Sequence, residues 1–139
     1  LYNQAADESA IAEVIAAAVA SFDPGLAVLC LPGSAMAAAA GEAGLHAVAE
    51  GYLDRAYDER GRLVPRSRPG AVITDGDAVV ARAVALATHV RVRSIEGNDV
   101  DVDVRSLCTH GDTPAALDLA RSARRALEDE GIAVRAFVD

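Results

Sequence analysis

The chain has 139 residues, of which 52% are hydrophobic and only 4% are aromatic, and its formal net charge at pH 7 is −8. This length fits one domain or a large part of one. The acidic balance argues against nucleic acid or an anionic membrane as a partner, because no basic field would attract phosphate groups. No apolar run approaches the roughly 20 residues needed to cross a bilayer, and nothing at the start marks export, so we expect a soluble protein.

The chain opens with a predicted helix for which Asp7 is the candidate cap, and the sequence "DPG" at 23–25 ends it. The run "LAVLCLP" at 26–32 is short, continuous and apolar, which is typical of a strand buried on both faces. The predicted buried stripe of the first helix consists of Ile11, Val14, Ile15, Ala18, Val19 and Phe22.

The next elements follow the same alternation. An alanine-rich helix is predicted to begin after Gly33 and Ser34 and to reach about Gly41. The run "LHAVAEG" at 45–51 predicts a second strand. The segment 52–70 then breaks the rhythm, because it is polar, rich in turn residues and crowded with arginine. Long connections of this kind in a compact chain are usually functional or disordered.

A further helix is predicted after a cap at Asp75 or Asp77. Segments 90–95 and 99–104 alternate with a period of two around "EGND", which predicts a hairpin. The residues expected to face inward from the helix are Val80, Ala83, Val84 and Ala87.

The last part of the chain predicts a strand, a helix and a strand. The strand leads into "SLCTHGD" at 106–112, and the helix opens at Thr113 and Pro114 and stops at Gly131. The run "IAVRAFV" at 132–138 predicts the final strand. The buried stripe expected for this helix consists of Ala116, Leu119, Ala120, Ala123 and Leu127.

The alternation of helices and strands predicts an α/β fold with a parallel sheet or barrel, in which ligands gather at the carboxyl ends of the strands. His110 and Asp112 follow the end of one predicted strand, and Glu50 ends another. If these strands are parallel neighbours, the polar residues lie together at the carboxyl ends of the strands and form a plausible acid/base and anion-binding set. The residues that follow Glu50 closely are Asp54, Arg55 and Tyr57.

Each of these residues also has a purely structural interpretation. Asp112 could serve as a helix N-cap, and His110 could be a core histidine bonded to the backbone. Glu50 could be a solvated strand end, and the arginines of segment 52–70 could simply solvate a loop.

Other patterns carry weaker signals. Cys30 and Cys108 lie in apolar runs without metal-ligand spacing, which favours reduced core thiols and a cytoplasmic location. "DVDVD" at 99–103 lacks the glycine and closing glutamate of an EF-hand, so we expect an acidic hairpin edge and no metal site. "LPGS" at 31–34 resembles a phosphate loop only weakly, because no GK[ST] follows.

Four stretches carry a resemblance to a known family. They are "LYNQAA" at 1–6, "LPGSA" at 31–35, "AEGYLDRAYDERGRLVPRSRPGAVI" at 49–73 and "CTHGDTPAALDLAR" at 108–121. The chain resembles the LamB/YcsF lactam-utilisation family, described as the A subunit of the ATP-dependent bacterial 5-oxoprolinase. The match runs in register along the whole chain, with Tyr52 where the family often has Phe.

The resemblance implies a cytoplasmic bacterial enzyme that works with partner subunits B and C. Together, the subunits would couple ATP hydrolysis to the opening of the small lactam 5-oxo-L-proline, giving L-glutamate. It also implies a seven-stranded (β/α) barrel of the glycoside hydrolase/deacetylase type. The polar residues that match those shared in the family are Asn3, Glu50, Asp54, Arg55, Tyr57, Arg66, His110 and Asp112.

Family members run to about 250 residues, so the resemblance implies that residues 1–139 are the carboxyl-terminal part of a single domain. About half of the barrel would then be missing from the chain, and the fragment alone would be inactive. An open half-barrel would expose sheet edges and apolar surface. The amino-terminal half could have been left out of this sequence, be supplied by another chain, or be replaced by self-pairing.

A lactam amide resists hydrolysis, so coupling to ATP makes sense if the lactam oxygen is phosphorylated. We expect Arg55 or Arg66 to contact anionic groups, with Tyr57 and Asn3 among the substrate-binding residues. His110 or Asp112 would activate water, with Glu50 or Asp54 as partner. Two other functions stay open: a metal-dependent, deacetylase-like hydrolase of a C–N bond, and a non-catalytic lactam-binding subunit.

Overall fold

The computed structural model describes residues 1–112 and 115–138, so the predicted helix opening at Thr113 and Pro114 lies outside the described residues. The chain divides into two compact units. Unit 1 comprises Leu1–Glu50 and the last residues from Phe137 on, and unit 2 comprises Gly51–Ala136.

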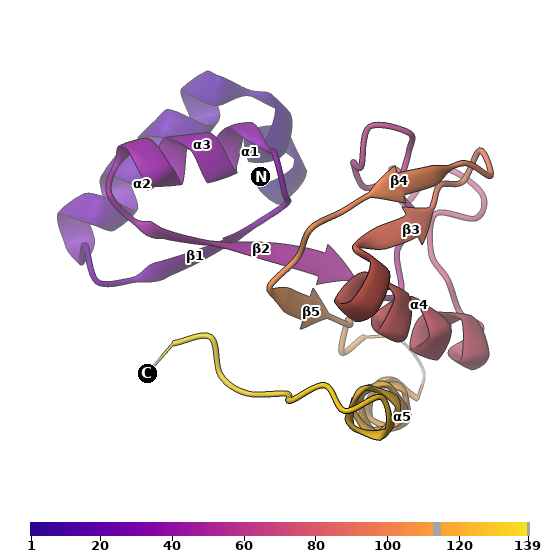
Figure 1. Cartoon of the computed structure of the whole chain (residues 1–139). Coiled ribbons are helices and arrows are strands. Elements are labelled where there is room, and N and C mark those ends of the chain that lie inside the picture. Colours follow the sequence, from indigo (N-terminus) through magenta and orange to yellow (C-terminus); the bar gives the residue numbers. More distant parts are fainter. Residues whose placement is uncertain (113–114, 139) are drawn as a thin grey trace. The chain divides into compact units, whose positions relative to one another are not determined.

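Unit 1 is built on a parallel strand pair (Figure 1). Ala27 lies opposite His46 and Cys30 lies opposite Ala49, and three helices gather on one side of the pair. This confirms the two strands and the helix between them that the apolar runs predicted, but β1 is not buried on both faces, because Leu29 is exposed. In chain order the elements are α1 (Tyr2–Asp7), α2 (Ser9–Phe22), β1 (Ala27–Cys30), α3 (Ala35–Glu42) and β2 (His46–Tyr52), whose last two residues belong to unit 2.

The start of the chain differs from the prediction. Asp7 ends α1 instead of capping the next helix, and Glu8 occupies the N-cap position of α2 without a side-chain hydrogen bond. The buried face of α2 is also rotated from the predicted stripe. Val14 and Phe22 are 71% and 84% exposed, whereas Ala12 and Ala16 are buried. Helices α1 and α3 pack on α2 closely, and small alanine side chains permit this approach.

The turn at Gly33 and Ser34 opens α3 as predicted. The Ser34 hydroxyl accepts a hydrogen bond from Ala37 N–H at 3.1 Å, which satisfies one of the free amides of the first turn. Gly33 has φ +62°, a conformation that favours glycine. The "LPGS" turn therefore serves as a helix cap, and its hydroxyl is engaged with the backbone.

Unit 2 begins at the end of β2, where β5 lies alongside. Leu53 N–H donates to Cys108 O at 2.9 Å at this point. The predicted hairpin is confirmed as an antiparallel pair in which Val92 lies opposite Val100. The remaining elements of unit 2 are α4 (Gly76–His89), β3 (Arg91–Arg93), β4 (Asp99–Asp101), β5 (Ser106–Cys108) and α5 (Ala116–Asp129).

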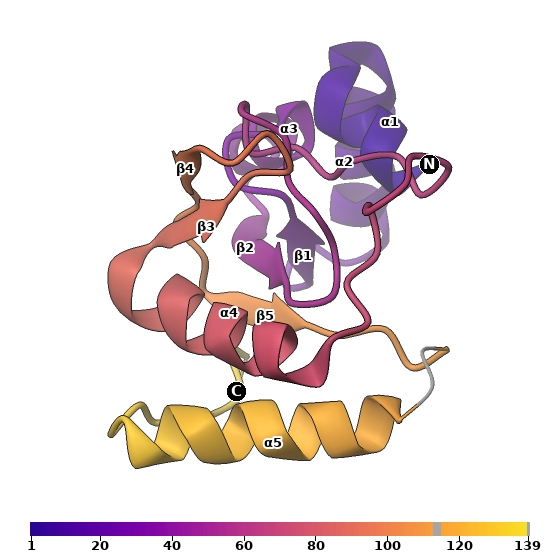
Figure 2. The same cartoon turned by 90° about the vertical axis from the view of Figure 1, so that its right-hand side faces the viewer.

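Helices α4 and α5 lie alongside each other in unit 2 (Figure 2). Asp75 caps α4 by accepting from Ala78 N–H at 3.0 Å, as one of the two predicted caps. The face that α4 buries differs from the prediction. Its buried residues are Val79, Ala83 and Leu86, whereas Ala87 is exposed.

The end of the chain corrects one prediction. Helix α5 buries Ala123 and Leu127 and is followed by Gly131 at φ +75°, as predicted. Residues 132–138 do not form a strand and are largely exposed. An apolar run becomes a strand only when a neighbouring backbone offers hydrogen-bond partners, and in the described part of the chain none pairs with this run.

The arginine-rich connection after β2 is an ordered and largely buried loop. Ala56, Val64 and Ala71 form a small core, and Ile95 packs against it. Isolated antiparallel bridges join Tyr57 to Leu63 and Arg55 to Val72. The apolar residues placed between the arginines thus fold the connection back on itself.

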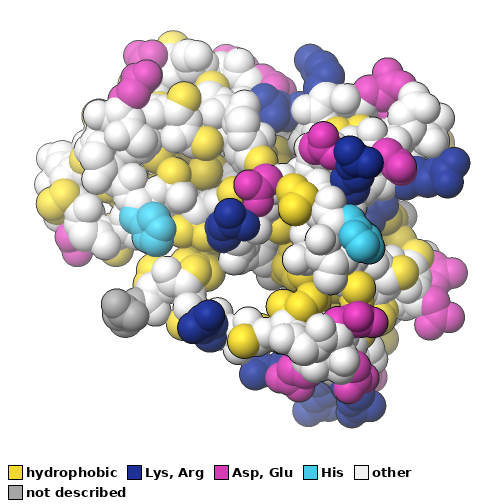
Figure 3. Space-filling model, in the orientation of Figure 1, with side chains coloured by type: hydrophobic (Ala, Val, Ile, Leu, Met, Phe, Trp, Pro, Cys, Tyr) yellow, Lys and Arg dark blue, Asp and Glu magenta, His cyan; other side chains and the backbone are white. Residues whose placement is uncertain are grey.

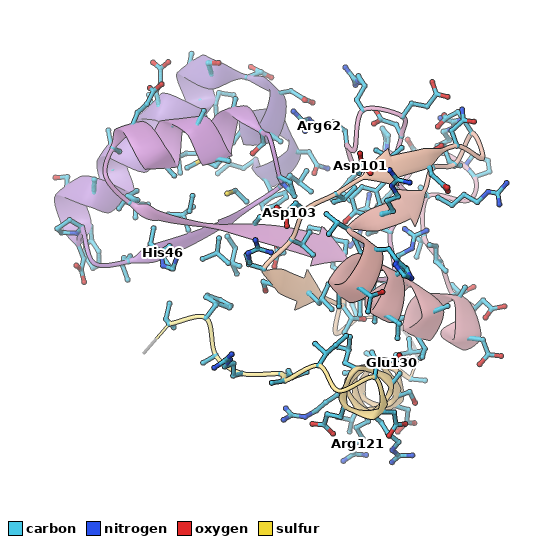
Figure 4. The ribbon with its side chains drawn as sticks, viewed as in Figure 1. His46, Arg62, Asp101, Asp103, Arg121 and Glu130 are labelled. Carbon is cyan, nitrogen blue, oxygen red and sulfur yellow. The ribbon has the colours of Figure 1, made fainter. Side chains whose placement is uncertain are left out.

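The surface of unit 2 mixes charges of both signs (Figure 3). On α5, Arg124 pairs with Glu128 at 2.8 Å, and Figure 4 shows Arg121 extending from the side away from α4. On the hairpin, Asp101 pairs with Arg91 at 2.6 Å, which agrees with the predicted acidic edge. Among the helices of the described residues, none combines the length and apolar content needed to cross a membrane.

Candidate active site

A buried carboxylate and a histidine form the centre of the site in unit 2. His110 Nδ1 lies 2.8 Å from Asp54 Oδ1 and 2.9 Å from Oδ2. The His110 backbone N–H also donates to Asp54 Oδ2 at 3.1 Å. Asp54 is 1% exposed, whereas the His110 side chain is 24% exposed. The carboxylate holds the proton on Nδ1, which leaves Nε2 with the lone pair a base requires.

This pair arises from two segments that are 56 residues apart. Asp54 follows the end of β2, and His110 follows the end of β5. The hydrogen bond between Leu53 N–H and Cys108 O fixes how the residues after β2 lie against the end of β5. The predicted meeting of the residues after both strand ends is therefore confirmed for Asp54 and His110.

One tyrosine stacks on the histidine ring, and a second tyrosine holds the first. The Tyr52 ring stacks on His110 with centroids 5.5 Å apart and an interplanar angle of 24°. The Tyr57 hydroxyl accepts from Tyr52 N–H at 2.6 Å. Tyr57 is 0% exposed, so its hydroxyl holds the loop in this structure, and its contact with a substrate stays a prediction.

Arg55 also faces the protein interior. Its Nη2 donates to Val64 O at 2.6 Å and its Nε to Ala71 O at 3.4 Å. Burial and then the nearby Arg66 lower the pKa of Arg55, against the opposing effect of Asp54 and the neighbouring tyrosines. Two guanidinium nitrogens of Arg55 are therefore engaged with loop carbonyls, and its contact with an anion stays a prediction.

Arg66 and Asp112 lie at the surface. Arg66 Nη1 is 3.7 Å from Asp112 Oδ2, and both side chains are more than half exposed. An exposed pair at this distance contributes little to stability, about 0–1 kcal/mol. Its members can therefore exchange this contact for a ligand with little loss, and of the two predicted anion-binding arginines Arg66 is the accessible one.

Glu50 and Asn3 belong to unit 1. Glu50 is buried, and Tyr2 Oη donates to its Oε2 at 3.3 Å. Asn3 is exposed on α1. Burial, followed by the charge of Glu50, raises the pKa of the Cys30 thiol. The catalytic role of Glu50 and the substrate contact of Asn3 stay predictions.

Sequence reasoning missed two contributors to the site. Tyr52 was noted only as a variation on Phe, yet its ring covers one face of the imidazole. Arg82 donates from Nη1 to Arg55 O at 2.5 Å and places its guanidinium 5.7 Å from the centre of the Tyr57 ring. Burial lowers the pKa of Arg82, and Tyr57 acts in the opposite direction. The aromatic residues of "GYLDRAY" were the available signal.

A groove of about 910 Å³ lies between α4 and the β3–β4 hairpin, and neither member of the Asp54–His110 pair (the dyad) lines it. Ala78, Ala81 and Ala85 line it together with Arg82, and it includes none of the predicted site residues. Asp54 and His110 lie outside this groove, and their pairing is of the kind that can transfer a proton.

Within residues 1–112 and 115–138, no three His, Cys, Asp or Glu side chains are placed to hold a metal ion. The turn at Ser34 is the nearest match to a phosphate loop, and its hydroxyl caps α3.

Parallel strands joined by a helix, and a carboxylate–imidazole pair beyond two strand ends, define an α/β protein equipped for acid/base chemistry. The sequence model of the LamB/YcsF family matches residues 1–139. The chain belongs to the LamB/YcsF family.

Two relatives of the chain are named as the A subunit of 5-oxoprolinase. The chain is 48% identical over 138 residues to the A subunit of 5-oxoprolinase from Nocardia farcinica and 50% identical over 139 residues to that of Streptomyces griseus. In both cases, the match covers 99% of this chain and 55% of the relative. The chain therefore spans little more than half the length of these curated relatives.

A solved structure shows the same fold. The crystal structure of a lactam utilization protein from Thermus thermophilus matches with a TM-score of 0.88 and 41% sequence identity. The match covers 98% of this chain and 54% of that one. The α/β fold with its parallel strands is thus shared with a family member.

Proposed function

We propose that the chain is the carboxyl-terminal part of the A subunit of an ATP-dependent 5-oxoprolinase, a cytoplasmic enzyme that opens 5-oxo-L-proline to L-glutamate. The observation that carries the proposal is the Asp54–His110 pair, together with relatives named as the A subunit of 5-oxoprolinase. Partner subunits B and C belong to the proposal, because a lettered subunit implies an assembly. The chain alone would be inactive.

The dyad supplies what hydrolysis of a lactam needs. Asp54 holds the His110 ring by Nδ1–H, so that Nε2 can accept a proton from water as the water oxygen bonds to the ring carbonyl carbon. When the ring C–N bond breaks, the same proton passes to the departing nitrogen. Asp54 also stabilises the imidazolium that exists between these two transfers. One proton is borrowed and returned, and one water molecule is consumed.

Arg66 is the residue that we assign to the anionic part of the substrate. Its guanidinium is half exposed and its contact with Asp112 is long, so a carboxylate can replace that partner bidentately. Asp112 would then act at the rim and not as the base. The turn at Ser34 is the nearest match to a phosphate loop among the described residues and its hydroxyl caps α3, so we assign ATP binding to the rest of the assembly.

The incomplete surface of unit 1 supports a larger fold, which we propose to be a seven-stranded (β/α) barrel. Among the described residues, β1 has β2 as its one strand neighbour. Leu29 on β1 and Phe22 on α2 are exposed. An apolar cavity of about 220 Å³ opens between α1, β1 and α3. A further strand and helix from the amino-terminal half would cover such a surface.

The test uses the complete A subunit assembled with subunits B and C, with release of glutamate from 5-oxo-L-proline as the measurement. We expect His110→Asn to lower kcat by about 100- to 10,000-fold, the usual contribution of a positioned acid or base. His46→Asn is the matched control, because His46 is an exposed histidine outside the site.

The outcomes separate the three candidate functions. Normal turnover by His110→Asn would remove the catalytic role. Lactam binding without turnover by the chain in any combination of subunits would favour a binding subunit. Turnover of an amide that is ATP-independent and abolished by a chelator would favour the deacetylase-like hydrolase.

A further inference from the structure

The imidazole of His110 is held from two directions by side chains of one loop. Asp54 engages the Nδ1 edge of the ring, and Tyr52 stacks on one of its faces. A hydrogen bond along the ring plane still permits the ring to rock about that contact. A stacked aromatic ring restricts that motion, since offset aromatic pairs favour a definite separation and tilt.

Tyr52 is itself fixed by a buried anchor. The Tyr57 hydroxyl accepts from Tyr52 N–H at 2.6 Å, and Tyr57 is completely buried. The guanidinium of Arg82 lies over the Tyr57 ring, within the roughly 6 Å range of cation–π attraction. Ile95 N–H donates to Tyr57 O at 2.8 Å, which ties the same residue to the start of the hairpin connection.

We propose that Tyr52 and Tyr57 are positioning residues for the proposed reaction: Tyr57 fixes the backbone at Tyr52, and the Tyr52 ring fixes the plane of the His110 imidazole, so that Nε2 is aimed at the attacking water. The proposal deepens the proposed function and relies on it for its kinetic predictions. Neither tyrosine touches the reacting atoms.

The stack has a second effect on the reaction. While His110 carries the transferred proton, its ring is a cation that faces the electron-rich face of Tyr52. An interaction that strengthens as the proton moves accelerates the step, whereas one present equally before and after does not. The aromatic ring is therefore the important part of Tyr52, and its hydroxyl is secondary.

Three variants of the complete enzyme test this assignment. Tyr52→Phe retains the ring, so we expect kcat within about threefold of the parent. Tyr52→Leu retains apolar volume without a ring, and kcat should fall about 10- to 100-fold with KM changed less than threefold, as for a small misplacement of a catalytic group. Tyr57→Phe removes the hydroxyl that accepts from Tyr52 N–H and should reduce kcat in the same direction by a smaller factor.

A spectroscopic readout tests the ring orientation without any reference to activity. His110 is one of three histidines in this chain, and in the complete, histidine-labelled subunit its signal is assigned as the one that disappears in His110→Asn. Nitrogen-15 NMR of the labelled ring then reports the Nδ1–H tautomer and the exchange of that proton with water. We expect the Nδ1–H signal to persist in Tyr52→Phe and to broaden in Tyr52→Leu and Tyr57→Phe.

The outcomes divide cleanly. An unchanged signal and unchanged kcat in Tyr52→Leu would overturn the proposal, and so would equal losses in Tyr52→Phe and Tyr52→Leu. If Tyr52→Leu does not fold, as judged by circular dichroism, the result for Tyr57→Phe decides. If His110→Asn is fully active while the NMR changes occur as expected, the catalytic function is wrong and the positioning of the ring stands.

Discussion

Replacing Asp54 by Asn tests the central pair most directly, because the change preserves shape and removes the charge. The Asp54 carboxylate accepts from two donors on His110, the ring Nδ1–H and the backbone N–H. An amide has one oxygen and one NH2 group, so the two donors must share a single uncharged oxygen or the imidazole must present its lone pair to the NH2 group. Hydrogen bonds to charged groups contribute about 1.5–3 kcal/mol each, so we expect the free energy of unfolding to fall by about this amount.

The assay is urea unfolding of the purified protein, monitored by circular dichroism. The free energies of unfolding are compared only if the parent and the variant show the same slope against urea concentration. Asp112→Asn is the matched control, since Asp112 is 72% exposed and its ion pair with Arg66 is long. The control should change the free energy of unfolding by less than about 1 kcal/mol. In the assembled enzyme, Asp54→Asn should also reduce kcat strongly, because the ring is no longer held in one tautomer.

The reasoning would be refuted if Asp54→Asn and Asp112→Asn lowered the free energy of unfolding equally. A double-mutant cycle with His110→Asn gives a stricter result. Two groups in direct contact should show an interaction energy of about 0.5–3 kcal/mol, and a value near zero would mean that they do not interact in solution.

Three further predictions follow from individual contacts. A Cβ on Gly51 would lie 2.9 Å from a Val104 methyl carbon, so Gly51→Ala should lower the free energy of unfolding by about 1–3 kcal/mol in the urea titration. Gly41→Ala is the control, because the space around Gly41 is open, and the free energy of unfolding should stay the same or rise. Burial acts to raise the pKa of Asp58, but hydrogen bonds from two loop N–H groups outweigh burial, and the pKa is lowered. The ionised Asp58 therefore stabilises the folded protein above the ordinary aspartate pKa of about 3.9, and this stabilisation is lost as the pH falls through the lower pKa of the folded state. If Asp58→Asn lowered the free energy of unfolding by the same amount from about pH 7 to about pH 2, this prediction would be wrong. Burial raises the pKa of Cys30, so iodoacetamide at about pH 8 should modify it only after unfolding, and peptide mass spectrometry that finds it modified in the native protein would disprove its burial.

The sequence predicted the parts of the site that depend on local order along the chain. Polar residues directly after two apolar runs pointed to strand ends, and parallel strands bring such ends together. That reasoning located both Asp54 and His110. It did not choose between Glu50 and Asp54 as the partner of the histidine, because the two lie close together along the chain and spacing does not reveal which one turns inward.

Arg55 and Arg66 show what the sequence could not predict. By composition, Arg55 and Arg66 are equivalent cations of one polar segment, and both were predicted to bind anions. The folded loop buries Arg55 against the carbonyls of Val64 and Ala71 and leaves Arg66 at the surface. The difference arises from apolar residues between them that fold the loop over, a long-range effect that no local pattern contains.

Periodicity and turn residues along the chain were sufficient to place most helices, the first two strands and the hairpin, because each depends on neighbours within a few residues. The tertiary structure alone decided which face of α2 and α4 is buried, and that the apolar run after Gly131 stays without a strand partner among the described residues. It also decided that the Asp54 carboxylate contacts the imidazole of His110 and that the Tyr52 ring stacks on it. These outcomes depend on contacts between distant segments, and such contacts exist only once the backbone has closed around them.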